Sequence, residues 1–275
     1  MKVLVTGANG YLGQGIVKAL LEDKIEVVAA DFKTNNIDKR ATVKACDLFT
    51  IPNPYEFFGK PDVLLHLAWR DGFVHNSNAH FEDFYKHYNF INSIVQSDIR
   101  KICVMGTMHE IGFYEGSIDS STSCKPQNYY GIAKNALRDA TSLLCKQYDK
   151  VFQWLRGYYI VGNSQFGSSI FSKITAAELA GQKEFPFTMG LNQYDFLEYD
   201  EFCYQVASIV EQDRINGIIN VCAGRPEKLS ERVERFILEN KFKIKLKYGA
   251  FPDRPYDSKA VWGNNMKISE ILKRK

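Results

Sequence analysis

The residues whose types and spacing most clearly suggest a reaction are a tyrosine and a lysine four positions apart. Tyr130 and Lys134 lie in the stretch YYGIAKNAL. On a helix, positions i and i+4 lie on the same face, so the two side chains can meet. An ammonium beside a phenol favours the phenolate and lowers the tyrosine pKa toward working pH. Such a tyrosine can protonate a carbonyl oxygen, or deprotonate an alcohol, while hydride moves at the attached carbon.

A glycine-rich turn near the start of the chain predicts a dinucleotide site. The segment TGANGYLG lies between a predicted strand and a predicted helix. Its first glycine permits the tight turn, the second lets the backbone approach a pyrophosphate, and the third allows close helix–strand packing. The helix then presents free N–H groups to the anion. A purely structural turn is the less favoured alternative. The cofactor-binding residues predicted here are Gly7, Asn9, Gly10, Tyr11, Leu12 and Gly13.

The acidic residue that ends the second predicted strand indicates which dinucleotide is bound. Asp31 would accept hydrogen bonds from the ribose hydroxyls of the adenosine and repel a 2′-phosphate, which favours NAD. Lys33, Lys39 and Arg40 lie close enough in sequence to accommodate NADP instead. The pair Asp47–Leu48 follows the third predicted strand and is expected either near the adenine or in a solvent-facing loop.

Short apolar strands alternate with helical stretches through the first half of the chain. This alternation predicts an α/β fold of the Rossmann type, a doubly wound parallel sheet with right-handed crossovers. The predicted strands span 2–7, 25–31, 42–48, 62–68, 101–107 and 151–162, and the predicted helices span 11–23, 78–97 and 127–148.

After residue 162 the alternation loosens, and Pro-, Gly- and aromatic-rich loops separate the helices. We expect residues 1–162 to form an NAD(P)-binding Rossmann domain and residues 163–275 to form a smaller C-terminal lobe interleaved with it. The strand 217–224 is expected to return to the main sheet. The predicted helices of this half span 169–181, 200–213, 230–240 and 267–274.

Composition narrows the functional classes. The chain is 45% hydrophobic and 24% charged, as in an ordinary soluble globular protein. Its formal net charge of +3, without a basic block, argues against a nucleic-acid partner. We see no signal peptide and no apolar run long enough for a membrane span. The six cysteines are scattered without a CxxC motif, which favours reduced thiols in a cytoplasmic protein.

In their order, these motifs resemble those of the extended short-chain dehydrogenases/reductases, a superfamily of nucleotide-sugar epimerases, dehydratases and ketoreductases. The resemblance covers nearly the whole chain and implies a lobe that binds a nucleoside-diphosphate sugar. It also implies a homodimer, in which the helices 78–97 and 127–148 pair in a four-helix bundle. The segments that carry it are TGANGYLG, Asp31, Asp47–Leu48, HLAW (66–69), Asn89, Thr107, Tyr130 with Lys134, and QYDFLEYD (193–200).

The resemblance assigns roles to particular residues. It implies that Tyr130 is the general acid/base and that Lys134 holds the nicotinamide ribose while lowering the tyrosine pKa. Thr107 stands where the family's catalytic Ser/Thr lies and would hydrogen-bond the reacting oxygen. Leu67 and Ala68 join the predicted cofactor-binding set.

Departures from the family's patterns help to choose the reaction. Dehydratases usually follow the catalytic Thr with an Asp-Glu pair, but here Met108 and His109 follow it. GDP-fucose-synthase-like epimerases need a histidine that residues 163–181 lack. His109 itself is expected either to contact substrate or to be structural or solvent-exposed, and the same alternatives hold for Glu110.

Substrate contacts are predicted from fewer signals. Trp69 replaces a small residue of the family and either narrows the sugar pocket or covers the nicotinamide. Tyr194 replaces an arginine that often binds the diphosphate, which leaves Arg225 and Arg254 as candidates, each with a surface charge as the alternative.

Three further histidines invite a metal-binding interpretation. His75, His80 and His87 are spaced poorly for one helix face, and hydride transfer needs no metal. We therefore predict no metal site and expect a polar helix surface or loop there.

The hypothesis favoured by the sequence is a nucleotide-sugar 4-ketoreductase that transfers hydride from NAD(P)H to C4 of a 4-keto(-6-deoxy) sugar. The alternative is an NAD-dependent C4 epimerase or 4-dehydrogenase. A non-catalytic dinucleotide sensor is a rival of another class, although such relatives commonly lose the Tyr–Lys pair.

Overall fold

A seven-stranded parallel sheet forms the centre of this computed structural model, which describes residues 1–162, 169–252 and 258–275. The strand order is β12-β7-β5-β4-β1-β2-β3, so chain order reverses between β1 and β4. Ligands of such sheets bind outside the carboxyl ends of the strands at this reversal. The strands are β1 (Lys2–Thr6), β2 (Glu26–Asp31), β3 (Thr42–Ala45), β4 (Val63–His66), β5 (Lys101–Thr107), β7 (Val151–Gly157) and β12 (Gly217–Val221).

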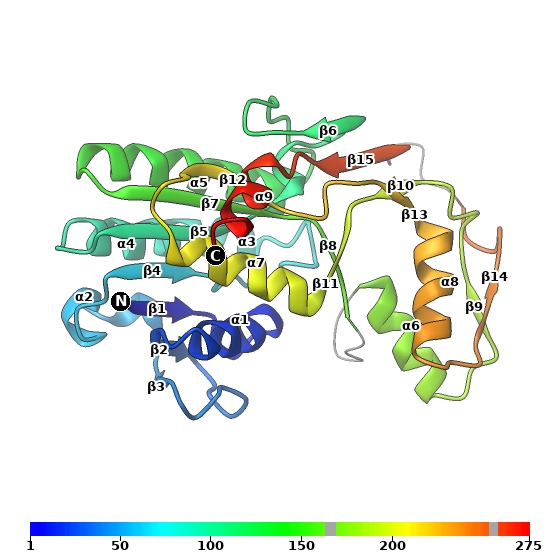
Figure 1. Cartoon of the computed structure of the whole chain (residues 1–275), viewed down its shortest axis with the longest axis horizontal. Coiled ribbons are helices and arrows are strands. Elements are labelled where there is room, and N and C mark those ends of the chain that lie inside the picture. Colours follow the sequence, from blue (N-terminus) through cyan, green and yellow to red (C-terminus); the bar gives the residue numbers. More distant parts are fainter. Residues whose placement is uncertain (163–168, 253–257) are drawn as a thin grey trace.

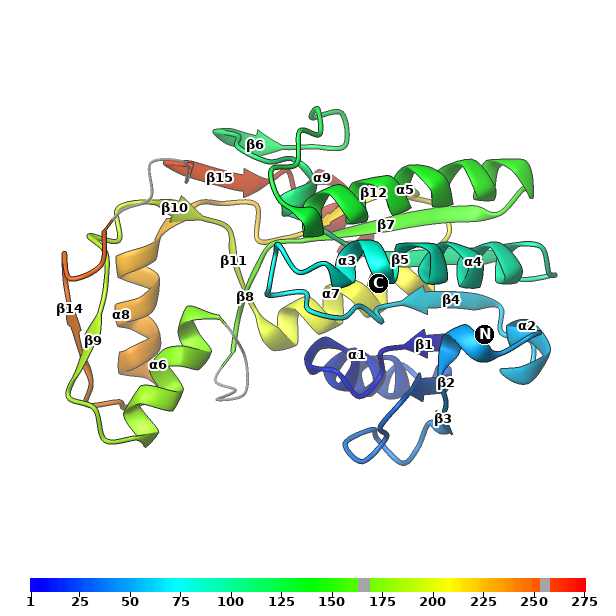
Figure 2. The same ribbon diagram turned by 180° about the vertical axis from the view of Figure 1, so that it is seen from behind.

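Helices cover both faces of this sheet (Figures 1 and 2). On one face, α1 (Tyr11–Glu22), α7 (Tyr199–Glu211) and α9 (Met266–Leu272) enclose one apolar cluster with the strands. On the other face, α4 (Phe84–Val95) and α5 (Tyr129–Gln147) enclose a second one. These layers confirm the predicted Rossmann-type fold.

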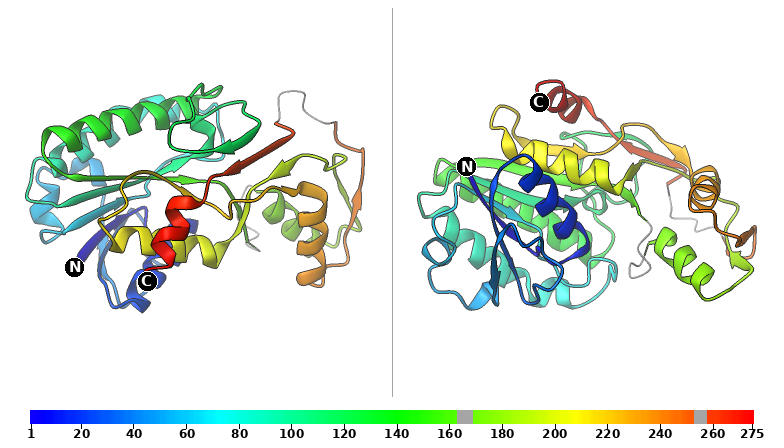
Figure 3. Two further views of the ribbon diagram at one scale, coloured as in Figure 1. Left: turned by 45° about the horizontal axis from the view of Figure 1, so that its top comes forward. Right: turned by 60° about the horizontal axis from the view of Figure 1, so that its bottom comes forward.

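A smaller assembly lies beyond the carboxyl edge of the sheet (Figure 3). Its apolar cluster joins the helices α6 (Ile170–Leu179) and α8 (Leu229–Glu239) through contacts such as Phe171 with Phe236, whose ring centroids are 5.1 Å apart. The strands of this part are β6 (Gly116–Ile118), β8 (Tyr159–Val161), β9 (Glu184–Pro186), β10 (Gln193–Tyr194), β11 (Phe196–Glu198), β13 (Glu227–Lys228), β14 (Lys245–Lys247) and β15 (Ala260–Gly263).

The second half of the chain is shared between these two assemblies. Strand β12 pairs in parallel with β7 at the edge of the main sheet, and α7 and α9 pack against that sheet. The lobe is therefore interleaved with the main sheet, and the described residues beyond 162 belong to both parts.

Three predicted elements were too long. The strand predicted over 151–162 breaks after Gly157, where the chain leaves the main sheet so that β8 can pair with β11. The helix predicted over 78–97 is α3 (Ala79–Glu82) followed by α4, with only Asp83 between them. The third strand ends at Ala45, because the Asp47 carboxylate accepts from Phe49 N and begins a short 3₁₀ helix.

The amino edge of the sheet is tied to α7 by a buried lysine. Lys101, the first residue of β5, is fully buried, and its ammonium donates to the carbonyls of Val210 and Gln212 and to the carboxylate of Asp213. The lysine thereby satisfies carbonyls at the C-terminal end of α7, which have no partner within the helix.

We expect Lys101→Met to lower the free energy of unfolding by about 1–3 kcal/mol, because carbonyls at the end of α7 lose their donor while the side-chain volume is kept. Urea unfolding followed by circular dichroism measures this change. The matched control is Lys18→Met on α1, whose side chain is 66% exposed and which should shift stability by less than about 0.5 kcal/mol. Equal effects of the two variants would contradict this account of Lys101.

Candidate active site

The predicted catalytic residues meet at the carboxyl edge of the sheet. Thr107 is the last residue of β5, and Tyr130 and Lys134 lie in the first two turns of α5. The helix begins where it does because the side chain of Asn128 caps it, accepting from Gly131 N. The Thr107 side chain hydrogen-bonds the Tyr130 side chain. All three members of the predicted trio are thus brought together.

Lys134 is buried and points at the backbone and an indole. Its ammonium donates to the Met105 carbonyl at 2.9 Å and lies 3.9 Å from the ring centroid of Trp69. The distance to the Tyr130 ring centroid is longer, 6.0 Å. Burial lowers the pKa of Lys134 to about 7, while the negative charge of Glu110 acts in the opposite direction. A cation over an indole is attracted by the ring, so Trp69 favours the charged form of the lysine.

Two features of the site act on the pKa of the Tyr130 phenol. Burial raises the pKa of Tyr130, and the hydrogen bond with Thr107 acts in the opposite direction. The sequence predicted that Lys134 would lower this pKa. In the structure the hydroxyl of Thr107 is the group that does so, because the lysine ammonium is directed to Met105.

The chain has five histidines, and all of them lie around the Trp69–Tyr130 pair. Within this group the Nδ1 atom of His80 accepts a hydrogen bond from the Trp69 indole at 3.0 Å. The ring of His87 stacks on that of Trp69, with the two centroids 4.5 Å apart. The five residues are His66, His75, His80, His87 and His109.

The prediction of a polar helix surface or loop for His75, His80 and His87 was wrong for the last two, whereas His75 lies in the turn-rich stretch before α3. His80 and His87 are 1% and 2% exposed. The signal was present in the sequence, because His87 lies three residues before Phe90 and four before Ile91, on the apolar face of α4. Two hydrogen bonds then lead inward, from His87 to His66 at 2.9 Å and from His66 to the hydroxyl of Thr6 at 2.8 Å.

These buried imidazoles are neutral near pH 7. Burial lowers the pKa of His87 to about 3 and that of His66 well below its usual range, and the nearby charge of Lys134 acts in the same direction on both. For His109, burial and the neighbouring His75 lower the pKa to about 4. Neutral rings can surround Lys134 without repelling its ammonium.

A buried carboxylate fixes the end of β5. Glu110 is fully buried, and one oxygen accepts from Thr107 N at 2.7 Å and from the Trp154 indole at 2.8 Å. Its other oxygen pairs with Arg156 at 3.3 Å and Arg138 at 3.4 Å. Glu110 is therefore a structural residue that holds Thr107 in place.

The glycine turn has the close approaches that a dinucleotide site requires. Gly7 has φ +69°, and a Cβ there would lie 2.7 Å from Ala68 N. A Cβ on Gly13 would lie 2.3 Å from the carbonyl oxygen of Gly7. Glycine is thus needed at both positions, whereas the Cβ position of Gly10 meets only that same carbonyl oxygen, at 3.2 Å. Tyr11, Leu12 and Gly13 form the first turn of α1.

The predicted adenosine side is also organised for a ribose. The carboxylate of Asp31 accepts from Asn9 N at 2.9 Å and from Phe32 N at 2.7 Å, which fixes it at the carboxyl end of β2. Arg40, one of the cations that could accommodate NADP, pairs with Asp38 at 2.7 Å. Leu48 is buried in the apolar cluster under α4. Its contact with adenine, and that of Asp47, stay predictions.

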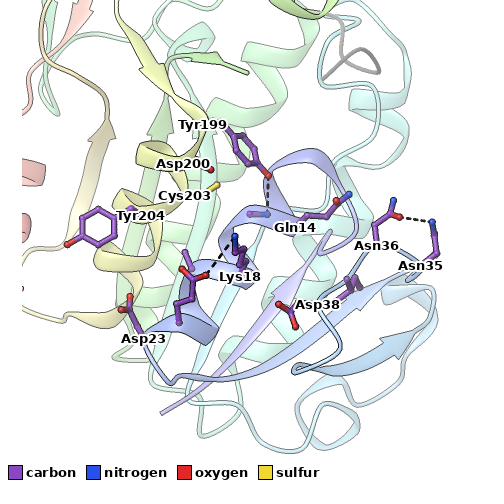
Figure 4. A pocket seen from close by; sticks show the side chains of 14 residues that line it. Gln14, Lys18, Asp23, Asn35, Asn36, Asp38, Tyr199, Asp200, Cys203 and Tyr204 are labelled. Carbon is purple, nitrogen blue, oxygen red and sulfur yellow. Dashed lines mark hydrogen bonds and ion pairs between the residues drawn. The ribbon is translucent and has the colours of Figure 1, made fainter. Parts of the chain in front are cut away.

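Two hollows lie away from the predicted catalytic trio. A groove of about 830 Å³ runs along the outer flank of α1 (Figure 4), where the hydroxyl of Tyr199 accepts from Gly15 N. Its lining is mixed in charge and includes Lys18, Asp38 and Asp200. Neither the three glycines of the turn (Gly7, Gly10 and Gly13) nor the trio line this groove, so it is separate from the glycine turn and from the trio.

The second hollow, of about 410 Å³, contains Arg225. Glu198, Glu201 and Glu227 line the same cleft and would repel a diphosphate. The other candidate, Arg254, lies outside the described residues. Diphosphate binding by either arginine stays a prediction, as does the contact of Trp69 and His109 with a sugar.

A family model with the description NAD dependent epimerase/dehydratase family matches residues 3–222. The chain belongs to this family. The match runs from β1 through β12 and so includes the glycine turn and the trio of Thr107, Tyr130 and Lys134. The predicted family, the Rossmann-type fold and NAD as cofactor are thereby confirmed.

Relatives resemble the chain over most of its length. A dTDP-6-deoxy-L-talose 4-dehydrogenase (NAD(+)) from Aggregatibacter actinomycetemcomitans is 40% identical over 270 residues, covering 96% of this chain and 99% of the relative. A GDP-6-deoxy-D-talose 4-dehydrogenase from the same organism is 24% identical over 233 residues, covering 82% of this chain and 75% of the relative.

A solved structure has the same fold. The UDP-glucuronic acid 4-epimerase from Bacillus cereus, in complex with UDP-glucuronic acid and NAD, superposes with a TM-score of 0.84 at 19% identity, covering 100% of this chain and 94% of that structure. Among the described residues, no helix is both long and apolar enough to cross a membrane.

We expect Glu110→Ala to lower the free energy of unfolding by about 3–5 kcal/mol, because it leaves the buried Arg156 without its counter-charge. Urea unfolding measures the loss. The control is Glu184→Ala, whose side chain is 63% exposed and whose ion pair with Lys247 is long, at 3.8 Å. A loss below about 1 kcal/mol for Glu110→Ala would refute the structural role given to this carboxylate.

We expect Asp31→Ser to weaken NAD binding about tenfold and to narrow the preference for NAD over NADP, because the carboxylate both accepts from ribose hydroxyls and repels a 2′-phosphate. Isothermal titration with each cofactor measures the two Kd values. Loss of affinity for both cofactors in equal proportion would show that Asp31 does not select between them.

Proposed function

We propose that this protein is an NAD-dependent 4-dehydrogenase of a 6-deoxyhexose linked to dTDP. The 40% identity to a dTDP-6-deoxy-L-talose 4-dehydrogenase, over 99% of that relative's length, carries this proposal. The gathering of Thr107, Tyr130 and Lys134 at the carboxyl edge of the sheet supports it. The sequence alone favoured a ketoreductase, and the relatives favour its stated alternative, in which the 4-hydroxy sugar is oxidised.

The reaction needs one proton acceptor and one hydride acceptor. Oxidation of a secondary alcohol breaks the O–H bond and the C–H bond at C4 and forms a ketone. NAD, which the glycine turn and Asp31 would hold, would supply the hydride acceptor. We assign the proton to the Tyr130 oxygen, with the Thr107 hydroxyl in hydrogen-bond contact to hold the sugar oxygen and stabilise the phenolate. Lys134 supplies the positive charge beside them and would reach the nicotinamide ribose.

Dehydration, another reaction of the family, needs a second acid/base pair directly after the catalytic threonine. The positions after Thr107 are Met108, His109 and Glu110, and the Glu110 carboxylate is bound by Arg156 and Trp154 in the protein interior. Interconversion of an alcohol and a ketone needs one proton carrier, and Tyr130 is sufficient for that role.

The direct experiment is to mix the purified protein with NAD and follow NADH absorbance. The substrate panel contains dTDP-6-deoxy-L-talose, its C4 epimer, GDP-6-deoxy-D-talose and UDP-glucose. We expect turnover with a dTDP-linked 6-deoxy sugar, and reversal when the 4-keto product and NADH are supplied. No change of cofactor with any of these sugars in either direction would refute the proposal.

A C4 epimerase is the second candidate, favoured by the solved UDP-glucuronic acid 4-epimerase that shares this fold. An epimerase retains its cofactor and needs none added. Conversion of the sugar at C4 without net NADH formation, by protein that copurifies with NAD, would replace the dehydrogenase proposal with this one.

We also propose that the protein is a homodimer. The two helices expected to pair, α4 and α5, lie side by side on one face of the sheet (Figure 2). Both expose apolar side chains there, with Tyr85 67% and Leu143 68% exposed. A dimer that pairs these helices would remove both side chains from water.

We expect Tyr130→Phe to lower kcat by about 10²–10⁴-fold, because it removes the oxygen that receives the proton. The Kd for NAD should stay within about threefold. Tyr129→Phe is a matched control, since the neighbouring ring is exposed and its hydroxyl has no assigned role. Steady-state kinetics of both variants make the comparison, and full activity of Tyr130→Phe would remove Tyr130 from the mechanism.

A further inference from the structure

We propose that the loop of residues 70–78 caps the catalytic helix and that His75, within this loop, positions the Tyr130 ring for proton transfer. This inference rests on the proposed function, since it concerns the same tyrosine. His75 acts in it through its contact with Tyr130 and is therefore a positioning residue.

The loop is joined to α5 by the first amides of that helix. The N–H groups in a helix's first turn have no partner inside the helix and need one outside it. Tyr129 N donates to the side chain of Asn76 at 3.2 Å, and Tyr130 N donates to the carbonyl of His75 at 2.8 Å. The next amide, Gly131 N, is capped locally by Asn128. The loop thus supplies the acceptors for the first two amides of α5.

Hydrogen bonds within the loop keep its shape. Val74 N donates to the Asp71 carbonyl at 2.8 Å, and the Ser77 hydroxyl donates to the Asp71 carboxylate at 2.7 Å. The imidazole of His80 bonds the Val74 carbonyl at 3.0 Å. Because His80 also accepts from Trp69, the loop is connected to the indole that lies against Lys134.

The His75 ring lies against the phenol. The two rings are nearly parallel, with an interplanar angle of 11° and centroids 5.6 Å apart. His109 lies beyond, with its ring centroid 4.2 Å from that of His75. On another side, the ring of His80 is 5.3 Å from the phenol. Tyr130 is therefore enclosed by rings that belong to three separate segments.

The rings around Tyr130 affect the rate of proton transfer because this rate depends on the position of the phenol oxygen. The oxygen must meet both the Thr107 hydroxyl and the oxygen on C4 of the sugar. Misplacement of a reacting group by about 1 Å can cost about 100-fold in rate. A flat ring stacked on the phenol limits its rotation, so removal of the His75 ring frees Tyr130 while leaving its hydroxyl intact.

The test compares His75→Ala with His75→Phe in the presence of saturating NAD. We expect His75→Ala to lower kcat about 10–100-fold with KM changed by less than about threefold, and His75→Phe to recover most of the loss because it restores a flat ring. The control is Phe73→Ala, in the same loop, whose side chain is 62% exposed and which should be neutral. Unchanged kcat in His75→Ala, or a His75→Phe variant as slow as the alanine, would overturn the positioning role.

A measurement without substrate separates this inference from the proposed function. With 3-fluorotyrosine incorporated, the ¹⁹F resonance of Tyr130 is identified by its absence in Tyr130→Phe. We expect this resonance to shift and broaden in His75→Ala and to stay sharp in His75→Phe. No change in His75→Ala would refute the inference even if the enzyme is active, and the expected change would support it even if no sugar in the panel is turned over.

The capping part of the proposal has its own readout. We expect Asn76→Ala to increase hydrogen exchange at the amide of Tyr129 by about tenfold, because that amide loses its acceptor, while amides in the middle of α5 are unaffected. Thermal unfolding of each variant checks that the fold is retained. Unchanged exchange at the Tyr129 amide would refute the capping role of the loop.

Discussion

The edge of the sheet that carries the predicted catalytic residues depends on one buried carboxylate. Glu110 accepts hydrogen bonds from the backbone of Thr107 and from Trp154, and it pairs with Arg156 and Arg138. These partners come from β5, β7 and α5, so a single negative charge holds together the strand that ends in the reactive hydroxyl and the helix that carries the phenol. Because a buried charge is costly without a partner, loss of Glu110 or of its arginine partners would destabilise the whole arrangement. An acidic residue that looks available for catalysis in the sequence is thereby used for structure.

Around that edge, the protein keeps its nitrogen-containing rings neutral and reserves positive charge for Lys134. Burial lowers the pKa values of His87 and His109, so neither competes with the lysine near pH 7. The indole of Trp69 then supplies the face against which the ammonium lies. This contact gives Trp69 a role in the free protein, beside the sugar contact predicted for it.

This environment limits the number of acids and bases that could exchange protons with a bound sugar. Here the carboxylate after Thr107 is withdrawn into an ion cluster, and the imidazoles near Tyr130 are bonded or stacked with other rings. With the phenol as the remaining proton carrier, oxidation or reduction at one carbon is what the site supports. The names of the relatives agree with this, and they favour the dehydrogenase direction over the ketoreductase that the sequence suggested.

The sequence by itself determined the features that depend on local spacing. The strand–glycine-turn–helix order, Asp31 after the second strand, the i, i+4 pair and the return of β12 to the sheet were all predictable, because each follows from a short motif or an apolar period. Only the tertiary structure decided the pairing of Glu110 with Trp154 and Arg156, the burial of His80 and the stacking of His75 on Tyr130. The contacts Trp69–His80 and His75–Tyr130, for example, join residues 11 and 55 positions apart, and no local period encodes them. Their geometry arises when the sheet places the ends of β4 and β5 beside the start of α5.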